Sequence, residues 1–150
     1  MNRKSHWESV YANRASSALS WHQQHPRRSL DLIKGTGLPK DARIIDVGGG
    51  DSSLVDDLIS EGYRDITVLD LSRAALNRAG ARVGNVASGR VAWLEGDILE
   101  LKLPAEAAAF QLLGSERETH RTPAGLDQPF TYCWCCYEPI GIEAVGAGSR

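Results

Sequence analysis

The stretch Ile44-Ile45-Asp46-Val47-Gly48-Gly49-Gly50-Asp51-Ser52-Ser53-Leu54 decides the fold of this 150-residue chain. An apolar, β-branched run ends in an acid, three glycines follow, and two serines precede a helical pattern. A second apolar run ends in Asp70, 24 residues after Asp46. A strand, a glycine turn and a helix, followed by a strand that ends in an acid, are typical of a nucleotide-binding α/β unit.

Length and composition limit the class of protein. The chain is long enough for one domain with a substantial core, and its 42% hydrophobic and 24% charged residues are ordinary for a globular protein. A net charge of -2 gives no electrostatic basis for binding nucleic acid or an anionic membrane. The basic start over residues 1–6 is followed by no apolar stretch, and no run approaches the ~20 apolar residues of a membrane span. We therefore expect a cytoplasmic protein without a nucleic-acid or membrane partner.

Residues 41–98 predict a cofactor-binding core of alternating strands and helices. Three short apolar runs are the expected strands, over residues 43–47, 66–69 and 91–94. Ser52 or Ser53 is expected to cap the first intervening helix, with an apolar stripe of Leu54, Val55, Leu58 and Ile59, and Ser72 to cap the second. A βαβαβ order predicts a parallel sheet with right-handed crossovers.

Residues 1–40 are expected to form a helical cap on this core. A helix over 5–13 is predicted, with Ser5 and Glu8 as a capping box, and a second helix begins at Pro26 and ends at Gly35 or Gly37. The residues expected to face inward are Trp7, Val10, Tyr11, Leu30, Ile33 and Leu32.

Residues 110–137 predict a terminal antiparallel hairpin, and residues 138–150 a tail. The hairpin strands are expected over 110–116 and 128–134, around a turn signal at 122–125. The three cysteines stand together in the segment Cys133-Trp134-Cys135-Cys136, with no second pair to complete a zinc site. We therefore expect no metal and interpret them as small apolar residues at the end of a strand.

Acids follow three consecutive predicted strands: Asp46, Asp70 and Asp97. Open α/β sheets bind ligands at the carboxyl ends of their strands. One such acid alone is more simply explained as a helix cap or a solvated charge. Three of them in consecutive units, together with the glycines, favour a ligand site.

The charge at the glycine turn favours one nucleotide ligand over another. A dinucleotide would present a pyrophosphate, which Asp46 would repel. S-adenosylmethionine (SAM) carries an ammonium and a sulfonium, which Asp46 would attract, and its carboxylate could use backbone N–H groups near Ser52. Asp70 could accept both ribose hydroxyls, a role that fits NAD equally well. The dinucleotide pattern G-x-G-x-x-G fails, however, because Ser53 stands at its last position.

These residues resemble the class I SAM-dependent methyltransferases of the small bacterial type. The first motif of that family, usually D/E-x-G-x-G-x-G, is here Asp46-Val47-Gly48-Gly49-Gly50-Asp51-Ser52, with Ser52 in place of the last glycine. The resemblance implies a Rossmann-like α/β fold, SAM as cofactor and methyl transfer as the reaction. It implies a cofactor-binding set of Asp46, Gly48, Gly49, Gly50, Ser52, Asp70, Leu71, Asp97, Ile98 and Trp21.

Individual roles follow from the same resemblance. Gly48 and Gly50 would let the ligand approach the backbone. Asp70 would hold the ribose with Leu71 beside the adenine, and Asp97 would accept from the adenine amine with Ile98 against the ring. Trp21 would cover the cofactor, although core packing explains this residue equally well.

The resemblance is interrupted between residues 99 and 109. Class I methyltransferases carry two further βα units there, of about 30 residues each, whereas only a dozen residues fill the gap. We therefore expect an incomplete sheet in which the strand over 43–47 has an open edge, unless the terminal hairpin moves in beside it. An open apolar edge pairs readily, so a homodimer is expected through it. Much of the acceptor pocket is also expected to be missing, so methyl transfer would be impaired.

The expected chemistry requires no nucleophilic side chain, because the acceptor attacks the methyl group directly. His22 and His120 are the candidate general bases. The acceptor, a small molecule or a protein, is not identified by the sequence. Two alternatives stay open, a non-catalytic SAM-binding or interaction module and an NAD-dependent oxidoreductase.

Overall fold

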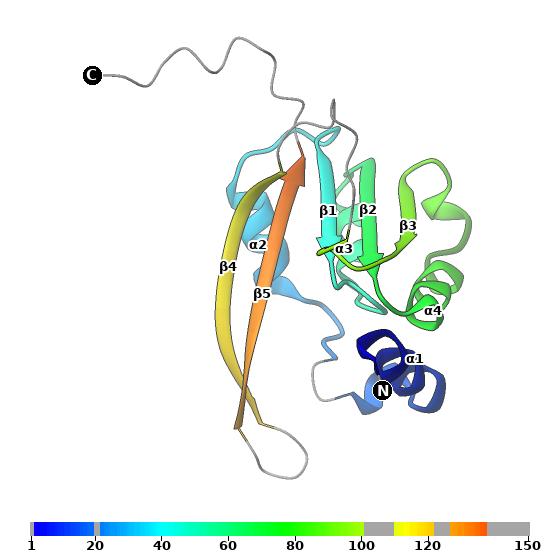
Figure 1. Ribbon diagram of the computed structural model, residues 1–150. Coiled ribbons are helices and arrows are strands. Elements are labelled where there is room, and N and C mark those ends of the chain that lie inside the picture. Colours follow the sequence, from blue (N-terminus) through cyan, green and yellow to red (C-terminus); the bar gives the residue numbers. More distant parts are fainter. Residues whose placement is uncertain (1, 20–21, 101–109, 122–126, 138–150) are drawn as a thin grey trace.

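The computed structural model describes residues 2–19, 22–100, 110–121 and 127–137, the last two ranges by their backbone. It confirms the predicted α/β fold, built on a five-stranded sheet in the order β3-β2-β1-β5-β4 (Figure 1). The strands are β1 (Arg43–Val47), β2 (Asp65–Asp70), β3 (Val91–Glu95), β4 (Phe110–Arg121) and β5 (Asp127–Tyr137). β1, β2 and β3 are parallel to one another, as the alternation of strands and helices predicts.

Four α-helices lie within the described residues: α1 (Arg3–Asn13), α2 (Arg27–Gly35), α3 (Leu54–Ser60) and α4 (Arg73–Val83). Two short 3₁₀ turns, η1 (Ser16–Ala18) and η2 (Gly84–Ala87), follow α1 and α4. None of the described helices is long and apolar enough to cross a membrane.

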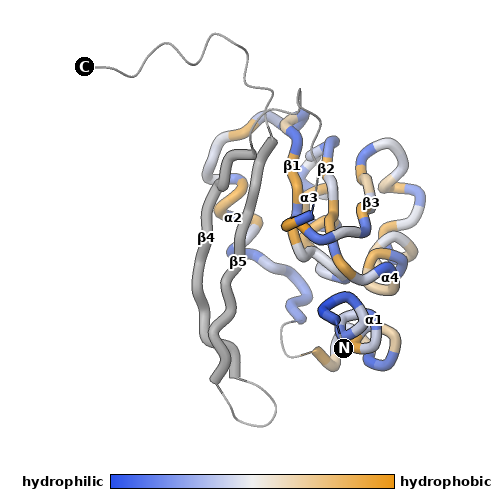
Figure 2. The backbone as a smooth tube through the Cα atoms, viewed as in Figure 1, coloured by the Kyte–Doolittle hydropathy of each residue, from blue (hydrophilic) through white to orange (hydrophobic). Residues whose placement is uncertain are grey.

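The core lies between one face of the sheet and helices α2, α3 and α4 (Figure 2). Alternate strand residues reach this face, among them Ile44, Ile66 and Val68, each at most 3% exposed. The predicted stripe of α3 is fully buried against them, and Ile33 of α2 joins the same cluster. Leu32 is 41% exposed, because the short helix turns only its Leu30 and Ile33 side toward the core.

The start of α1 differs from the sequence prediction. Asn2 is the N-cap, and its Oδ1 accepts a hydrogen bond from the backbone N–H of Ser5 at 2.8 Å. The helix therefore begins at Arg3, whereas a Ser5 cap would start it three residues later. Glu8 is consequently not the partner of Ser5 in a capping box, and its carboxylate is engaged elsewhere. The Ser72 cap of α4 is confirmed, since its Oγ accepts from the backbone N–H of Ala75.

The edge of β1 is not open where the sequence analysis expects it to be. β5 pairs antiparallel with β1 and places Tyr137, Cys136 and Cys135 opposite Arg43, Ile44 and Ile45. The backbone groups of this part of β1 thus find partners within the chain, and the homodimer stays a prediction. The β4–β5 hairpin lies beside β1, which the sequence analysis gave as the alternative to an open edge.

The β4–β5 pair is longer than the two predicted strands. It runs from the pairing of Phe110 with Tyr137 to that of Arg121 with Asp127, with one irregularity between Leu112 and Gly114. Figure 1 shows it extending past the carboxyl ends of β1 and β2, with α2 beside it. The predicted turn at 122–125 and the tail at 138–150 lie outside the described residues, and the division of the chain into cap, core and hairpin stays a prediction.

Candidate cofactor-binding site

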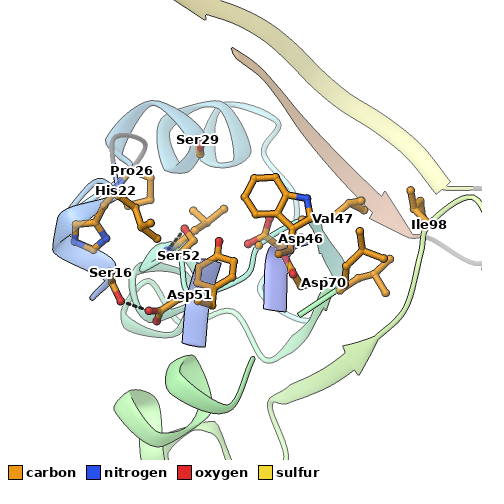
Figure 3. Close-up of a pocket in the computed structure, with 18 of the residues that line it drawn as sticks. Ser16, His22, Pro26, Ser29, Asp46, Val47, Asp51, Ser52, Asp70 and Ile98 are labelled. Carbon is orange, nitrogen blue, oxygen red and sulfur yellow. Dashed lines mark hydrogen bonds between the residues drawn. The ribbon is translucent and has the colours of Figure 1, made fainter. Parts of the chain in front are cut away.

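A cavity of about 380 Å³ lies at the carboxyl ends of β1 and β2 (Figure 3). α1, residues of the segments 16–19 and 22–29, and the turn after β3 form its other walls. The structure brings most of the predicted site residues together on its lining: Asp46, Gly48, Gly49, Ser52, Asp70, Leu71, Asp97 and Ile98. Gly50 does not contribute to the lining, and Trp21 lies outside the described residues.

Asp46 is a half-buried carboxylate near the end of β1. Within the described part of the chain, no hydrogen bond or ion pair engages its side chain. Burial, helped by the negative charge of Asp70, raises its pKa from 3.8 to about 6. The protein therefore holds an acid that a cation in the cavity would stabilise in its charged form.

Asp70 ends β2 and is only 9% exposed. Its Oδ1 accepts from the backbone N–H of Ser72 at 2.8 Å, and the backbone N–H groups of Gly50 and Leu71 also point to the carboxylate. Burial still raises its pKa, because these hydrogen bonds only partly compensate for lost water. No cation neutralises Asp70 within the described residues, so the cavity contains two uncompensated carboxylates.

The three glycines of the turn have three different environments. Gly48, with φ +75°, lines the cavity, and a Cβ built on it would meet no atom within 4 Å. A Cβ on Gly49 would lie 2.7 Å from Cγ of Asp46 and 2.9 Å from Cγ1 of Val68, so Gly49 makes room for the acid. Gly48 is thus the glycine at which the backbone itself borders the cavity.

Gly50, the second glycine expected to let the ligand approach, adjoins Tyr11 and Asp70 in the structure. Its φ is +49°, and a Cβ there would lie 2.8 Å from Oη of Tyr11 and 3.1 Å from Oδ2 of Asp70. The missing side chain therefore leaves space for Tyr11 of α1, which itself lines the cavity. Sequence spacing could not show this, because Tyr11 comes from a helix 39 positions earlier in the chain.

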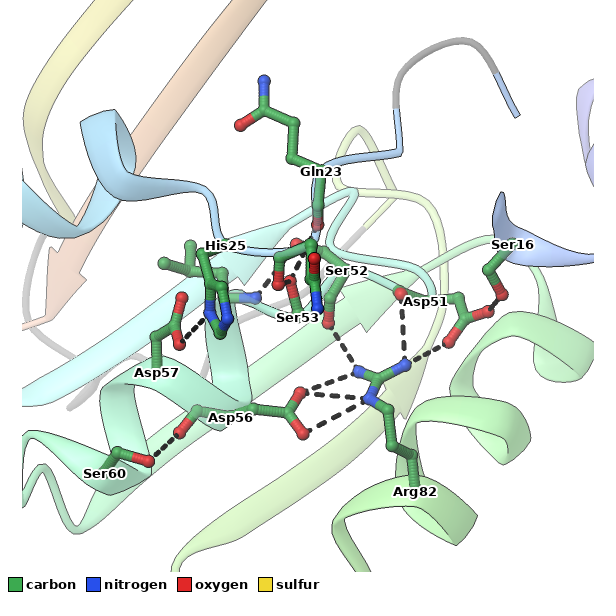
Figure 4. A network of polar contacts seen from close by, with 12 residues as sticks. Ser16, Gln23, His25, Asp51, Ser52, Ser53, Asp56, Asp57, Ser60 and Arg82 are labelled. Atoms are coloured by element: carbon green, nitrogen blue, oxygen red, sulfur yellow. Dashed lines mark hydrogen bonds and ion pairs between the residues drawn. The ribbon is translucent and has the colours of Figure 1, made fainter. Parts of the chain in front are cut away.

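The two serines after the turn hold the segments around the cavity in place. Ser52 Oγ accepts from the backbone N–H of Leu54, the first residue of α3, at 3.1 Å, whereas Ser53 is at the N-cap position and makes no side-chain cap hydrogen bond. Ser53 Oγ donates to the carbonyls of Gln23 and Gln24 at 2.9 and 2.8 Å (Figure 4). The segment that carries His22 is thereby attached to the start of α3, and His22 lines the cavity.

Asp51 is a buried acid on the cavity wall that does have a counter-charge. Arg82 reaches its Oδ1 at 2.5 Å and Asp56 at 2.8 Å, and the Ser16 hydroxyl donates to Oδ2 of Asp51 (Figure 4). This network joins η1, the glycine turn and α4. Arg78 Nη1 lies 3.9 Å from Oδ2 of Asp51, so the two acids of the network face two arginines, in contrast to Asp46 and Asp70.

Asp97 is also engaged by a cation. Nη2 of Arg3 lies 2.6 Å from its Oδ2, and its Oδ1 accepts from the backbone N–H of Leu99 at 3.0 Å. A ligand amine at Asp97 would therefore share the carboxylate with Arg3. Ile98, beside it, is 43% exposed on the cavity rim.

Sequence reasoning missed the contribution of α1 to the cavity. Arg3, Trp7 and Tyr11 line it from one side of this helix. The spacing of Trp7 and Tyr11 predicts an inward face, and Tyr11 is indeed buried. What that face covers depends on tertiary contacts that spacing does not specify. His120 lies in β4, of which only the backbone is described, so its role as a general base stays a prediction.

The profile of the methyltransferase domain family matches residues 44–141. The chain belongs to this family. The predicted assignment to the class I SAM-dependent methyltransferases is confirmed, and SAM is the cofactor of the domain. The family match decides against the NAD-dependent oxidoreductase.

Individual relatives agree with the family at low identity. The mouse protein named eEF1A lysine and N-terminal methyltransferase is 25% identical over 108 residues, which are 72% of this chain and 15% of that protein. The chain thus spans only 15% of the length of this curated relative.

Solved structures support the fold. A putative RNA methyltransferase from Pyrococcus horikoshii superimposes with a TM-score of 0.54 at 11% identity, covering 96% of this chain and 99% of that one. A SAM-dependent methyltransferase from Anabaena variabilis gives 0.53 at 12% identity, covering 93% and 96%. At these identities the likeness concerns the fold alone.

The cavity fits SAM in its chemistry. SAM has two cationic groups and a ribose diol, which the two carboxylates without counter-charges, Asp46 and Asp70, could bind. The exposed backbone at Gly48 allows close approach from the same side. Asp46 and Asp70 would hold the cofactor, and the neutralised Asp51 would serve the structure of the wall.

Proposed function

We propose that this chain binds SAM in the cavity at the ends of β1 and β2 and transfers its methyl group to an acceptor. The observation that carries the proposal is the pair of carboxylates, Asp46 and Asp70, that have no cation within the described residues. Asp46 would face the ammonium and sulfonium end, and Asp70 would accept the ribose hydroxyls.

The residues contribute mainly by binding and orienting. Bound SAM supplies an electrophilic methyl group on its sulfonium. Asp46 and Gly48 would fix the methionine end, so that the sulfonium points in one direction, and much of the rate of such a reaction comes from positioning. Trp7 and Tyr11 of α1 would exclude water from one side. His22 is exposed and on the lining, where it could take a proton from the acceptor.

An amine on a protein is the first acceptor class that we propose to test. The supporting observation is the likeness to the mouse eEF1A lysine and N-terminal methyltransferase. A small-molecule acceptor is the alternative. We also propose a cytoplasmic location, in keeping with the ordinary charged and apolar content of the chain, and cell fractionation tests it.

Calorimetry with S-adenosylhomocysteine tests cofactor binding, and transfer of labelled methyl from SAM to protein and small-molecule acceptors tests activity. Binding that is lost in Asp70→Ala and kept in Asp65→Ala is the expected result. Asp65 starts the same strand and pairs with Arg43 at its exposed end, so it is a matched control. Absence of binding by the parent chain would refute the proposal, and binding without transfer to any acceptor would point to the non-catalytic module.

A further inference from the structure

Glu8 of α1 makes its contacts at the N-terminus of another helix. Its Oε1 accepts from the backbone N–H of Arg73 at 2.7 Å. Its Oε2 accepts from the Ser72 hydroxyl at 3.0 Å and from the backbone N–H of Ala74 at 3.2 Å. Glu8 thus satisfies the first free N–H groups of α4, an 11-residue helix, where a negative charge is also favoured by the helix dipole.

Ser72 connects this contact to the predicted ribose carboxylate. It is fully buried, and its backbone N–H donates to Oδ1 of Asp70 at 2.8 Å while its hydroxyl donates to Glu8. Glu8, Ser72 and Asp70 therefore form one hydrogen-bonded chain from α1 to the end of β2. The negative charge of Glu8 also contributes to raising the pKa of Asp70, which shows how close the two carboxylates are.

The same helix provides a wall of the cavity. Trp7 precedes Glu8 and Tyr11 follows it by three positions, and both line the cavity. At the far end of α1, Arg78 of α4 donates to the carbonyl of Tyr11 and, at 2.7 Å, to that of Arg14. Figure 1 shows α1 beside α4, with contacts between the two helices along the shared side.

We propose that Glu8 is a positioning residue of the cofactor site, which docks α1 on α4 and so holds Trp7 and Tyr11 against the bound cofactor. The inference rests on the proposed function. Its energetic basis is a carboxylate that accepts three hydrogen bonds, two of them from backbone N–H groups at a helix start, which are stronger than bonds between neutral groups. Without Glu8, the N-terminus of α4 can be satisfied by water, and α1 loses its attachment near the ligand.

Two variants of Glu8 and one control test the proposal by calorimetry with S-adenosylhomocysteine. Glu8→Ala removes all three acceptor contacts and should weaken binding by about tenfold or more. Glu8→Gln keeps one acceptor oxygen and should give an intermediate loss. Glu61 does not line the cavity, and its carboxylate lies 2.8 Å from Nζ of Lys34. In the control variant Glu61→Ala, binding should therefore stay within about twofold of the parent.

Hydrogen exchange separates docking of α1 from general loss of structure. In Glu8→Ala, amides of residues 3–13 should exchange faster while those of 54–60 in α3 keep the protection of the parent. S-adenosylhomocysteine should slow exchange in residues 3–13 of the parent and do so far less in the variant. Should Glu8→Ala prove unfolded by circular dichroism, the same comparison is made on Glu8→Gln.

The proposal is overturned if Glu8→Ala, folded, binds within twofold of the parent or leaves exchange of residues 3–13 unchanged. It is overturned equally if only Glu8→Gln folds and that variant behaves like the parent. If the parent itself fails to bind S-adenosylhomocysteine, the proposed function fails, whereas exchange without ligand still decides whether Glu8 docks α1.

Discussion

Replacing Asp46 with asparagine should stabilise the protein and weaken its cofactor binding. The side chain keeps its shape beside Gly49 but can no longer carry a charge. In the folded protein the pKa of Asp46 is raised from 3.8 to about 6, so the charged form is less favourable there than in the unfolded chain. For a raised acid pKa, the stabilising contribution is fully present below about pH 4 and is lost as the pH rises through 6.

The expected change in stability follows from the size of the pKa shift of Asp46. A shift of this size corresponds to about 3 kcal/mol in free energy of unfolding between low pH and pH 8. Because Asp46 borders an open cavity, water reduces the penalty, and we expect Asp46→Asn to gain about 1–2 kcal/mol at pH 8. At pH 4 the parent acid is largely protonated when folded, so parent and variant should be much closer in stability.

Urea unfolding of both proteins between pH 4 and 8 measures this difference directly. Calorimetry with SAM and with S-adenosylhomocysteine, which lacks the sulfonium charge, measures the other half of the prediction. Loss of affinity for SAM should exceed that for S-adenosylhomocysteine if Asp46 faces the sulfonium, and the losses should be equal if it faces only the ammonium. Equal stability at pH 8 together with unchanged affinity for both ligands would refute the assignment of a cation to Asp46.

Three further outcomes are expected. Asp70→Ala should weaken S-adenosylhomocysteine binding by about 1.5–3 kcal/mol, the range for hydrogen bonds to a charged group, as measured by calorimetry against Asp65→Ala. SAM affinity of the parent should fall as the pH drops below about 6, where Asp46 takes up a proton, and this dependence should vanish in Asp46→Asn; a flat profile in the parent would contradict it. Gly48→Val puts a side chain into the cavity and should abolish binding; although no protein atom lies within 4 Å of the added Cβ, φ is +75° there, so urea unfolding should also show a loss of about 1–3 kcal/mol in stability.

Features that depend on local pattern could be predicted from the sequence. The strand over 43–47 has the predicted bounds, and the stripe of α3 that includes Leu58 is buried as expected. Ser72 caps α4 because a serine oxygen at that position has a free N–H within reach, whatever the rest of the fold does. Asp46 and Asp70 meet at one edge because parallel strands end on the same side of a sheet.

Features that depend on distant partners could not be predicted. Ser5 and Glu8 have the spacing of a capping box, yet Asn2 caps α1 and Glu8 caps a helix more than 60 positions away. Both arrangements satisfy free N–H groups, and only the docking of α1 on α4 distinguishes them. Gly50 is a similar case, since the side chain that a Cβ at this position would meet, Tyr11, comes from a distant helix.

The acids around the cavity show why charge balance identifies the site better than the count of acids does. Asp51 forms an ion pair with Arg82, and Asp97 forms one with Arg3, so each acid has a counter-charge without a ligand. Asp46 is half-buried and Asp70 is buried, and neither has such a partner within the described residues, which costs the folded protein stability. A fold selected for stability alone would place apolar or amide side chains at these two positions. A cationic ligand that pairs with both acids would explain why the chain keeps Asp46 and Asp70 on one cavity lining, and this is why the stability gain and the binding loss in Asp46→Asn should appear together.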